Sequence, residues 1–404
     1  MTDRAGLAPA SSTTAGLYIH IPFCVFLCPY CDFDKQAHDL DRLPVYVDAL
    51  IADLHRQPPA RLHSIYFGGG TPSLLSGEQV HRVLAACRER FDLVDDVEIS
   101  LEANPNDLTA EKVAAFREAG VNRVSVGAQA FDDLALKKLG RQHTAEQAVA
   151  AVEAVRRGGV ANVNVDLMFG LPDKAGTMER WERSLSVAVS LRPTHLSCYL
   201  LTLEDTTPQG RALRAGRIAL PDDEAVAAMY RRCRTVLRQH GYRHYEISNW
   251  ALPDHACRHN LGYWSDEPYL AVGAGACGYW NGVRYKNTPV VRQYLAAALG
   301  GAPIPLVERE ELTPLERARD AALLGLRRLD GVDLASFRHR YGICLEEACA
   351  ETIAMAERLG LMERADGRLR LTPSGLLVSM DLFARLHLEI AANGPTSSVR
   401  GNVA

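Results

Sequence analysis

The feature that most constrains the fold is an alternation of short apolar runs with amphipathic segments between residues 17 and 205. Each run is rich in Val, Ile, Leu, Tyr or Phe, as expected for strands that are buried on both faces. The six runs begin near Leu17, Ser64, Val97, Asn122, Ala161 and His195. Six strand-then-helix units in a row predict an α/β fold with a parallel sheet. Their regular repetition favours a TIM-like partial (β/α)6 barrel, with an open doubly wound sheet as the alternative.

The segments between these runs carry signals for helix starts and ends. Thr144, followed three residues later by Gln147, is a capping-box pattern. Thr109 can open a second helix that closes at Gly120, and Ser76 can cap a third. These signals predict helices in the connections, as a barrel requires.

Beyond residue 220 the pattern changes. A long amphipathic helix is expected first, and a stretch rich in Gly and aromatic residues follows over 242–285. A linker around residue 300 precedes signals for three helices and a hairpin turn at Asp366-Gly367. This order of elements predicts a small C-terminal α+β domain of the winged-helix type.

The chain therefore divides into four expected parts. They are a flexible tail over 1–15, a barrel over 16–220, an extension over 221–299 and the C-terminal domain over 300–404.

Composition restricts the class of function. The 404 residues include 45 Lys and Arg against 49 Asp and Glu, and this balance gives no sign of a surface for nucleic acid. No apolar run approaches the roughly 18 to 20 residues that a membrane helix needs, and the first fifteen residues lack the apolar stretch of a signal peptide. Ten cysteines in a chain of this size favour a cytoplasmic protein with thiols or a metal centre over a disulfide scaffold.

Three of the cysteines, Cys24, Cys28 and Cys31, follow directly on the first expected strand. A zinc site normally takes four protein ligands, or three and a water, and its cysteines usually come as spaced pairs. Three thiolates can instead hold a [4Fe–4S] cluster and leave its fourth iron open to another ligand. A loop at the carboxyl end of the first barrel strand is also where a barrel places its chemistry. The spacing and the position together indicate an iron–sulfur site.

The segment from Tyr18 to Phe33 resembles the radical S-adenosylmethionine superfamily. Its pattern is most similar to the branch that contains the oxygen-independent coproporphyrinogen III oxidases and the HemW-type haem chaperones, and the likeness extends into the C-terminal domain. The resemblance implies a [4Fe–4S] cluster on Cys24, Cys28 and Cys31, with S-adenosylmethionine chelating the open iron. It also implies a 5′-deoxyadenosyl radical as the product of electron transfer, and a reductant such as flavodoxin or ferredoxin.

The carboxyl ends of the next four expected strands carry a glycine-rich turn and three polar residues. Glycines in the turn after the second strand, Gly68–Ser73, let the backbone approach a ligand closely. Glu102, Gln129 and Asp166 lie near the carboxyl ends of the third, fourth and fifth strands. A charged group in an otherwise apolar strand is costly unless it is paired or serves a ligand. Internal ion pairs with an arginine, Arg123 or Arg141, are the alternative.

The resemblance assigns individual positions to S-adenosylmethionine, with the glycine-rich turn binding its amino group. Tyr18, Gly69 and Glu102 match positions that contact the cluster-bound molecule. The positions that the oxidase uses for a second molecule are matched by Tyr30, Gly70, Thr71, Gln129, Arg141 and Asp166.

A second motif, from His259 to Trp264, matches the HNxxYW pattern that HemW-type proteins use for haem. A neutral imidazole is a common axial ligand of haem iron, and aromatic side chains can stack on the macrocycle. The resemblance therefore implies haem binding by His259, Asn260, Tyr263 and Trp264.

Two departures from the oxidase pattern favour a haem chaperone that passes haem to an acceptor protein. Phe33 stands where the oxidase has a fourth cysteine, and the chain enters its first strand by residue 17 without the oxidase's longer N-terminal extension. The main alternative is a radical S-adenosylmethionine oxidase or transferase that acts on a porphyrin-like substrate. A winged-helix regulator with an iron–sulfur sensor is a third possibility.

One departure from the chaperone pattern is Cys277, where HemW-type relatives usually have histidine. A thiolate at Cys277 as a second haem ligand is a hypothesis that follows from this difference.

Overall fold

The computed structural model describes residues 13–37, 39–172 and 177–393. The chain forms two compact units, and each is built from more than one segment. The first unit holds residues 1–244, 248–261 and 268–309, and the second holds residues 245–247, 262–267 and 310–404.

The first unit is built on a twelve-stranded sheet with the order β14-β13-β12-β11-β1-β4-β5-β6-β7-β8-β10-β9. The six strands expected from the sequence are adjacent and parallel within it. They are β1 (Thr14–Ile21), β4 (Arg61–Gly69), β5 (Asp92–Ala103), β6 (Arg123–Gln129), β7 (Asn162–Phe169) and β8 (His195–Leu200). Because their spatial order follows the chain, every right-handed crossover places its helix on the same side of the sheet. The partial barrel is confirmed, and the doubly wound alternative is wrong.

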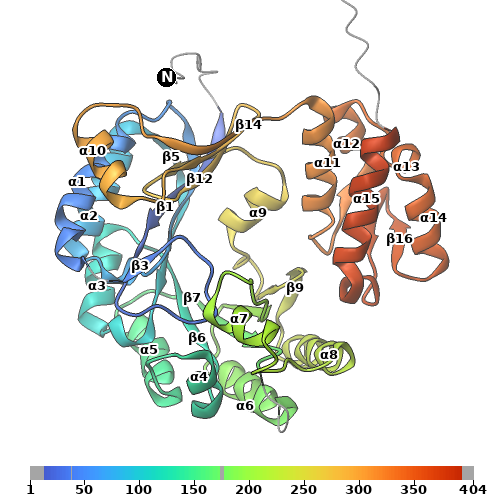
Figure 1. Ribbon diagram of the computed structural model, residues 1–404, viewed down its shortest axis with the longest axis horizontal. Coiled ribbons are helices and arrows are strands. Elements are labelled where there is room, and N and C mark those ends of the chain that lie inside the picture. The colour runs from blue at the N-terminus through green and yellow to red at the C-terminus, as the bar shows by residue number, and fades with distance from the viewer. Residues whose placement is uncertain (1–12, 38, 173–176, 394–404) are drawn as a thin grey trace, which may run out of the picture. The chain divides into compact units, whose positions relative to one another are not determined.

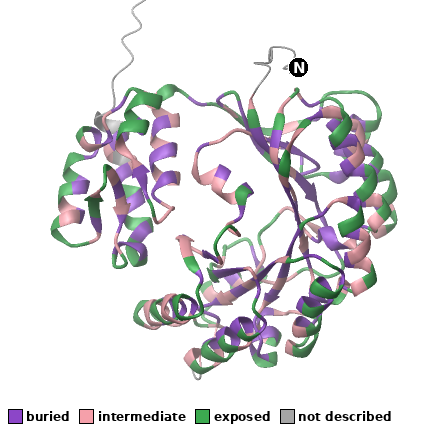
Figure 2. Ribbon diagram, turned by 180° about the vertical axis from the view of Figure 1, so that it is seen from behind, coloured by how far each residue is buried: buried purple, intermediate pink, exposed green. Residues whose placement is uncertain are grey.

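The helices that connect these strands cover the outer face of the curved sheet (Figure 1). They are α1 (Leu43–Leu54), α2 (Gly77–Arg90), α3 (Ala110–Ala119), α4 (Asp133–Leu139), α5 (Ala145–Arg157) and α6 (Thr177–Ser190). Ser76 and Thr144 complete capping boxes, and Thr109 accepts a hydrogen bond from the Lys112 amide, as their sequences predict. Buried residues concentrate in the strands and on the inner faces of these helices, and exposed residues lie on the outer faces (Figure 2).

Residues 221–299, expected as a separate extension, supply strands to both edges of the same sheet. After α7 (Pro208–Arg214) and α8 (Asp223–Gln239), the short β9 (Arg243–Glu246) and β10 (Asn249–Ala251) extend the edge at β8. After α9 (Arg258–Trp264), a seventh parallel strand, β11 (Tyr269–Val272), pairs with β1. The remaining elements are β12 (Cys277–Trp280), β13 (Val283–Asn287), α10 (Val291–Leu299) and β14 (Leu306–Glu311). The boundaries expected at residues 220 and 299 therefore do not coincide with the limits of the compact units.

The tail expected over 1–15 lies mostly outside the described residues. Thr14 and Ala15 already belong to β1, so the strand begins before the expected end of the tail.

The second unit combines helices with a three-stranded sheet, as expected for a winged-helix-like fold. Its elements are α11 (Pro314–Gly325), β15 (Val332–Asp333), α12 (Leu334–Tyr341), α13 (Leu345–Ala348), α14 (Ala350–Arg358), β16 (Met362–Ala365), β17 (Arg368–Leu371) and α15 (Ser379–Asn393). Asp366 and Gly367 both have positive φ, which the tight turn between β16 and β17 requires. The third expected helix is divided at Cys349, and α15 has no counterpart in the sequence prediction. None of the helices in the described segments has the length and hydropathy needed to cross a membrane.

Tyr46 of α1 connects β1 to the end of β11, and its replacement tests that connection. Its buried hydroxyl donates to the His20 carbonyl (2.9 Å) and accepts from the Ala274 amide (2.9 Å). Tyr46→Phe should lower the free energy of unfolding by about 1–3 kcal/mol, because it leaves these two buried groups unpaired. Urea unfolding of the full chain measures the change. Unchanged stability, with the Ala274 amide still protected from hydrogen exchange, would contradict this role.

Candidate functional site

The three clustered cysteines lie on a loop that is closed by two very short strands. β2 (Phe23–Cys24) pairs in parallel with β3 (Gln36–Ala37). Inside the loop the Cys31 amide donates to the Cys28 carbonyl (3.2 Å), and Lys35 Nζ donates to the Cys31 carbonyl (2.7 Å). The backbone thus fixes the turn that carries Cys28 and Cys31, next to the end of β1.

The cysteine loop and the carboxyl ends of β4 to β8 enclose a cavity of about 440 Å³. Most of the residues that the sequence singled out line it together. They are Cys24, Cys28, Tyr30, Cys31, Gly69, Gly70, Thr71, Glu102, Gln129, Arg141, Asp166 and Asn260. Residues from seven separate segments meet here because the carboxyl ends of parallel strands lie at one edge of the sheet.

Two of the thiols have polar neighbours. Thr71 Oγ1 donates to Cys24 Sγ (3.4 Å), and Arg141 Nη1 donates to Cys28 Sγ (3.5 Å). Burial raises the pKa of the Cys24 thiol, and the hydrogen bond from Thr71 opposes that shift. Sulfur binds metal as the thiolate, and a thiolate can accept both of these hydrogen bonds.

The glycine-rich turn after β4 lies directly against the cysteine loop. A Cβ on Gly70 would lie 2.7 Å from the Phe23 carbonyl oxygen and 3.0 Å from Cys24 Sγ. Gly69 has a φ of +112° and donates its amide hydrogen to Glu102 Oε2 (3.3 Å). Only glycine fits at either position, so the turn keeps its backbone groups close to the thiols.

Two of the carboxyl groups that line the cavity, those of Glu102 and Asp166, are largely shielded from solvent and share a cation. Burial raises the pKa of Glu102 to about 7, although Tyr66 donates a hydrogen bond to it (2.8 Å). Burial also raises the pKa of Asp166, against a hydrogen bond from Ser125 (2.8 Å). The positive charge of Arg123, which is only 1% exposed, lowers the pKa of both groups.

Arg141, the second arginine considered as an ion-pair partner, does not serve these carboxyl groups. Its Nη2 donates to Asn104 Oδ1 (2.6 Å) and to the Gly127 carbonyl (2.9 Å). The alternative of an ion pair with these carboxyl groups therefore does not hold for Arg141.

Gln129 ends β6 at an irregularity in its pairing with β7. Its φ of 64° is uncommon for a residue other than glycine, and strained positions of this kind cluster at functional sites.

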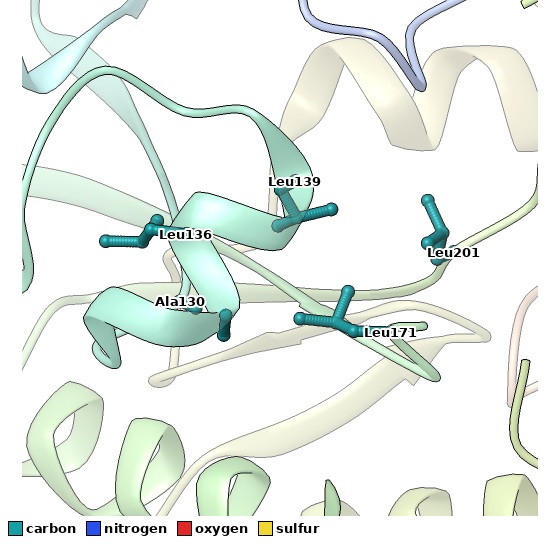
Figure 3. Close-up of a cluster of buried hydrophobic side chains, with 6 residues drawn as sticks. Ala130, Leu136, Leu139, Leu171 and Leu201 are labelled. Atoms are coloured by element: carbon teal, nitrogen blue, oxygen red, sulfur yellow. The ribbon is translucent and has the colours of Figure 1, made fainter. Parts of the chain in front are cut away.

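Tyr30 is held in place by an apolar cluster beside the cavity. The cluster is formed by Ala130, Ala135, Leu136, Leu139, Leu171 and Leu201 (Figure 3). Tyr30 packs against it, and burial raises the pKa of its hydroxyl. The positive charge of Arg141 lowers the pKa of the Tyr30 hydroxyl, against the effect of burial. Tyr30 and Arg141 both line the cavity.

Comparison with known proteins identifies the family. Residues 18–181 match the radical SAM superfamily, and residues 312–378 match the HemN C-terminal domain. The chain is 36% identical to the heme chaperone HemW of Lactococcus lactis, over 92% of this chain and 97% of the relative. The chain belongs to the HemW family. The heme chaperone HemW of Bacillus subtilis is also 36% identical, over 91% of this chain and 97% of the relative.

A solved structure has the same fold. The coproporphyrinogen III oxidase HemN of Escherichia coli, a radical SAM enzyme, aligns with a TM-score of 0.78 and 23% identity. The match covers 94% of this chain and 90% of that one, so the HemW-family chain shares the HemN fold along nearly its whole length.

The first histidine of the HNxxYW motif is enclosed in the barrel instead of facing the cavity. His259 is 2% exposed, and its Nδ1 is hydrogen-bonded to Ser64 Oγ (2.9 Å). Its ring stacks on Tyr66, with centroids 5.0 Å apart, and lies 6.4 Å from Tyr18. Burial lowers its pKa to about 3, so the imidazole is neutral. In this conformation its ring does not fit as an axial haem ligand.

The rest of the motif lies along α9, whose residues from Gly262 onward belong to the second unit. Asn260 lines the cavity. The guanidinium of Arg327 stacks over the ring of Trp264, with Arg327 Cζ 4.5 Å from the ring centroid. Of the two motif residues in the first unit, His259 and Asn260, only Asn260 lines the cavity.

Tyr18, expected to contact S-adenosylmethionine, does not line the cavity either. Its hydroxyl donates to His20 Nδ1 (3.0 Å), and His20 Nε2 donates to the Asp34 carbonyl (2.7 Å). Burial lowers the pKa of His20, which keeps it neutral for these two roles. Tyr18 thus supports the cysteine loop through His20.

Cys277 is exposed at the start of β12, and it is not among the residues that line the cavity.

Several cavity residues were not singled out from the sequence. They include Tyr66, Asn104, Ser125, Asn164 and Ser197. The signal was present in β7, where Asn162, Asn164 and Asp166 alternate with valines. A strand with this period of two has one polar face, and in a barrel that face points inward.

The raised pKa of Glu102 predicts a pH-dependent stability for the protein without ligands. A carboxyl group whose pKa rises from 4.5 to about 7 on folding stabilises the native state at low pH. That contribution is lost as the pH rises through this range, because the unfolded chain then releases its proton more easily. Glu102→Gln should therefore flatten the fall in urea midpoint between about pH 5 and pH 8. The exposed Glu118→Gln should keep the wild-type slope, and equal slopes in all three proteins would contradict the assignment.

Proposed function

We propose that this chain is a haem chaperone: it binds haem and passes it to an acceptor protein, on a scaffold that carries a [4Fe–4S] cluster and S-adenosylmethionine. The observation that carries the proposal is the match to relatives named heme chaperone HemW over 97% of their length. The sequence supports the chaperone over an oxidase, because Phe33 stands where the oxidase pattern has a cysteine.

The cavity has the donors that a cluster and its chelating cofactor need. Cys24, Cys28 and Cys31 would hold the [4Fe–4S] cluster, since their side chains line the same cavity. The bound pair of cofactors supplies one-electron chemistry at the barrel mouth. The hydroxyl of Thr71 and the guanidinium of Arg141 donate hydrogen bonds to two of these sulfur atoms.

Residues around the glycine-rich turn would hold S-adenosylmethionine. Gly69 and Gly70 line the cavity beside the cysteine loop, and Glu102 offers a carboxyl group next to Gly69. The further contacts proposed are with Tyr30, Thr71, Gln129, Arg141 and Asp166, all of which line the cavity. Tyr18 would act through His20 and the cysteine loop.

Haem is the cargo, and the proposal makes its binding depend on the HNxxYW motif. Asn260 can reach a ligand in the cavity directly. His259 would act by fixing the start of α9, since its ring is bound to Ser64 and its amide lies 3.4 Å from the Glu98 carboxylate. Tyr263 and Trp264 complete the motif. The proposal does not include Cys277 as a haem ligand, because Cys277 does not line the cavity.

The proposal also includes partners and a location. The cluster would need a reductant such as flavodoxin or ferredoxin, and the haem an acceptor protein. The thiol-rich composition and the balance of charges suit a cytoplasmic protein that does not bind nucleic acid.

Removal of one thiol tests the cluster. Cys28→Ala should lose most of its iron and acid-labile sulfide after anaerobic reconstitution, because two thiolates hold a cluster poorly. The control variant Cys344→Ala changes a cysteine more than 300 residues after the three clustered cysteines, and its iron and sulfide contents should equal those of wild type. A full cluster in Cys28→Ala would contradict the assignment.

A haem titration tests the function. Anaerobic titration followed at the Soret band should saturate near one haem per chain. His259→Ala should bind about tenfold more weakly while its Soret maximum stays at the wild-type position, because the enclosed ring positions α9 and does not ligate iron. Absence of saturable binding, or release of 5′-deoxyadenosine coupled to a changed porphyrin, would contradict the chaperone. A shifted Soret maximum in His259→Ala would show direct ligation instead.

A further inference from the structure

The cysteine loop exposes two phenylalanines, whereas the other phenylalanines of the chain are buried. Of the ten phenylalanines in the sequence, eight are buried. The other two, Phe26 and Phe33, are 46% and 62% exposed, and both belong to the loop between β2 and β3. Large exposed apolar side chains that gather at one place mark a binding surface rather than ordinary protein exterior.

These two rings are part of a larger apolar rim. Tyr199 and Leu200, at the carboxyl end of β8, are also exposed. All four side chains line the same cavity as the three cysteines, so they surround its opening. We use the name aromatic rim for Phe26, Phe33, Tyr199 and Leu200.

The rim also has a cation beside it. Lys35 lines the cavity, and its ammonium donates to the carbonyl oxygens of Cys31 (2.7 Å) and Phe33 (3.3 Å). An ammonium group has three hydrogens, so one remains for an anionic group of a ligand. Asp32, which lies on the same loop and is exposed, is the nearby charge of opposite sign.

A flat apolar macrocycle with carboxylates at its edge fits this arrangement. Its faces can stack on aromatic rings, and a propionate can reach Lys35. Haem has this shape and these charges. The enclosure of His259 points the same way, because haem in this cavity meets the rim and Asn260 before any imidazole of the motif.

We propose that haem binds with its macrocycle on the aromatic rim, above the cysteines, and with a propionate at Lys35. The inference rests on the proposed haem-binding function and names the surface that performs it. Binding here depends on the porphyrin face more than on a bond to its iron.

The first test removes the rim's aromatic faces. Phe26→Ser/Phe33→Ser should bind haem at least about tenfold more weakly than wild type in the anaerobic Soret titration. Leu299→Ser changes a side chain of similar exposure (50%) at the end of α10 and should bind as wild type does. Iron and sulfide content of each variant is measured alongside, so that loss of the cluster is not mistaken for loss of the rim.

The second test removes the metal from the ligand. Metal-free protoporphyrin IX should bind wild type within about tenfold of haem and should lose affinity in the double variant as haem does. Haem affinity that is unchanged in a double variant with an intact cluster would overturn the inference and leave the chaperone proposal standing. Failure of metal-free protoporphyrin to bind would also overturn the inference. Failure of wild type to bind haem at all would overturn the proposed function itself.

Discussion

The arrangement of the site depends on the contact between the glycine-rich turn and the cysteine loop. The Gly70 amide donates to the Ile21 carbonyl (2.8 Å), and the space for a Cβ at Gly70 is filled by Phe23 and Cys24. This contact joins the end of β4 to the end of β1 and sets where the first thiol lies. The remaining cavity residues are positioned by the sheet, whose parallel strands end at one edge.

The barrel interior is polar where many barrels are apolar, and hydrogen bonds join several of its polar groups. Asn164 Nδ2 lies 2.7 to 3.0 Å from Ser125 Oγ, Asp166 Oδ1 and Ser197 Oγ, and these three acceptors share its two hydrogens. A buried polar group without a partner costs about 1–3 kcal/mol, so this network must be nearly complete for the strands to assemble. The network also ties the carboxylate of Asp166 to strands β6, β7 and β8, which fixes the floor of the cavity.

The sequence predicted the parallel core well because its signals are local. Capping residues such as Ser76 and Thr144 and the runs of apolar residues report on the chain within a few positions. Strand β11 has only four residues, and its pairing with β1 joins segments about 250 residues apart, so no local period identifies it. For the site as well, local patterns could be predicted and contacts between distant segments could not. The cysteines and the glycine-rich turn were found by pattern, whereas the enclosure of His259 depends on Ser64 and Tyr66 from a distant strand.

Two phenylalanines are exposed on a loop with little regular structure, so the folded protein lacks the stabilisation that their burial would give. Full burial of such a side chain stabilises a protein by about 1.5–3 kcal/mol, and the chain gains this at its eight other phenylalanines. The loop is held by backbone hydrogen bonds and by Lys35, so its geometry does not require aromatic side chains at Phe26 and Phe33. Their free energy of burial is therefore available to a ligand, and a large apolar ligand gains most from it. In the proposed arrangement haem and the [4Fe–4S] cluster would meet at the same opening of the barrel, because the rim and the three cysteines line one cavity.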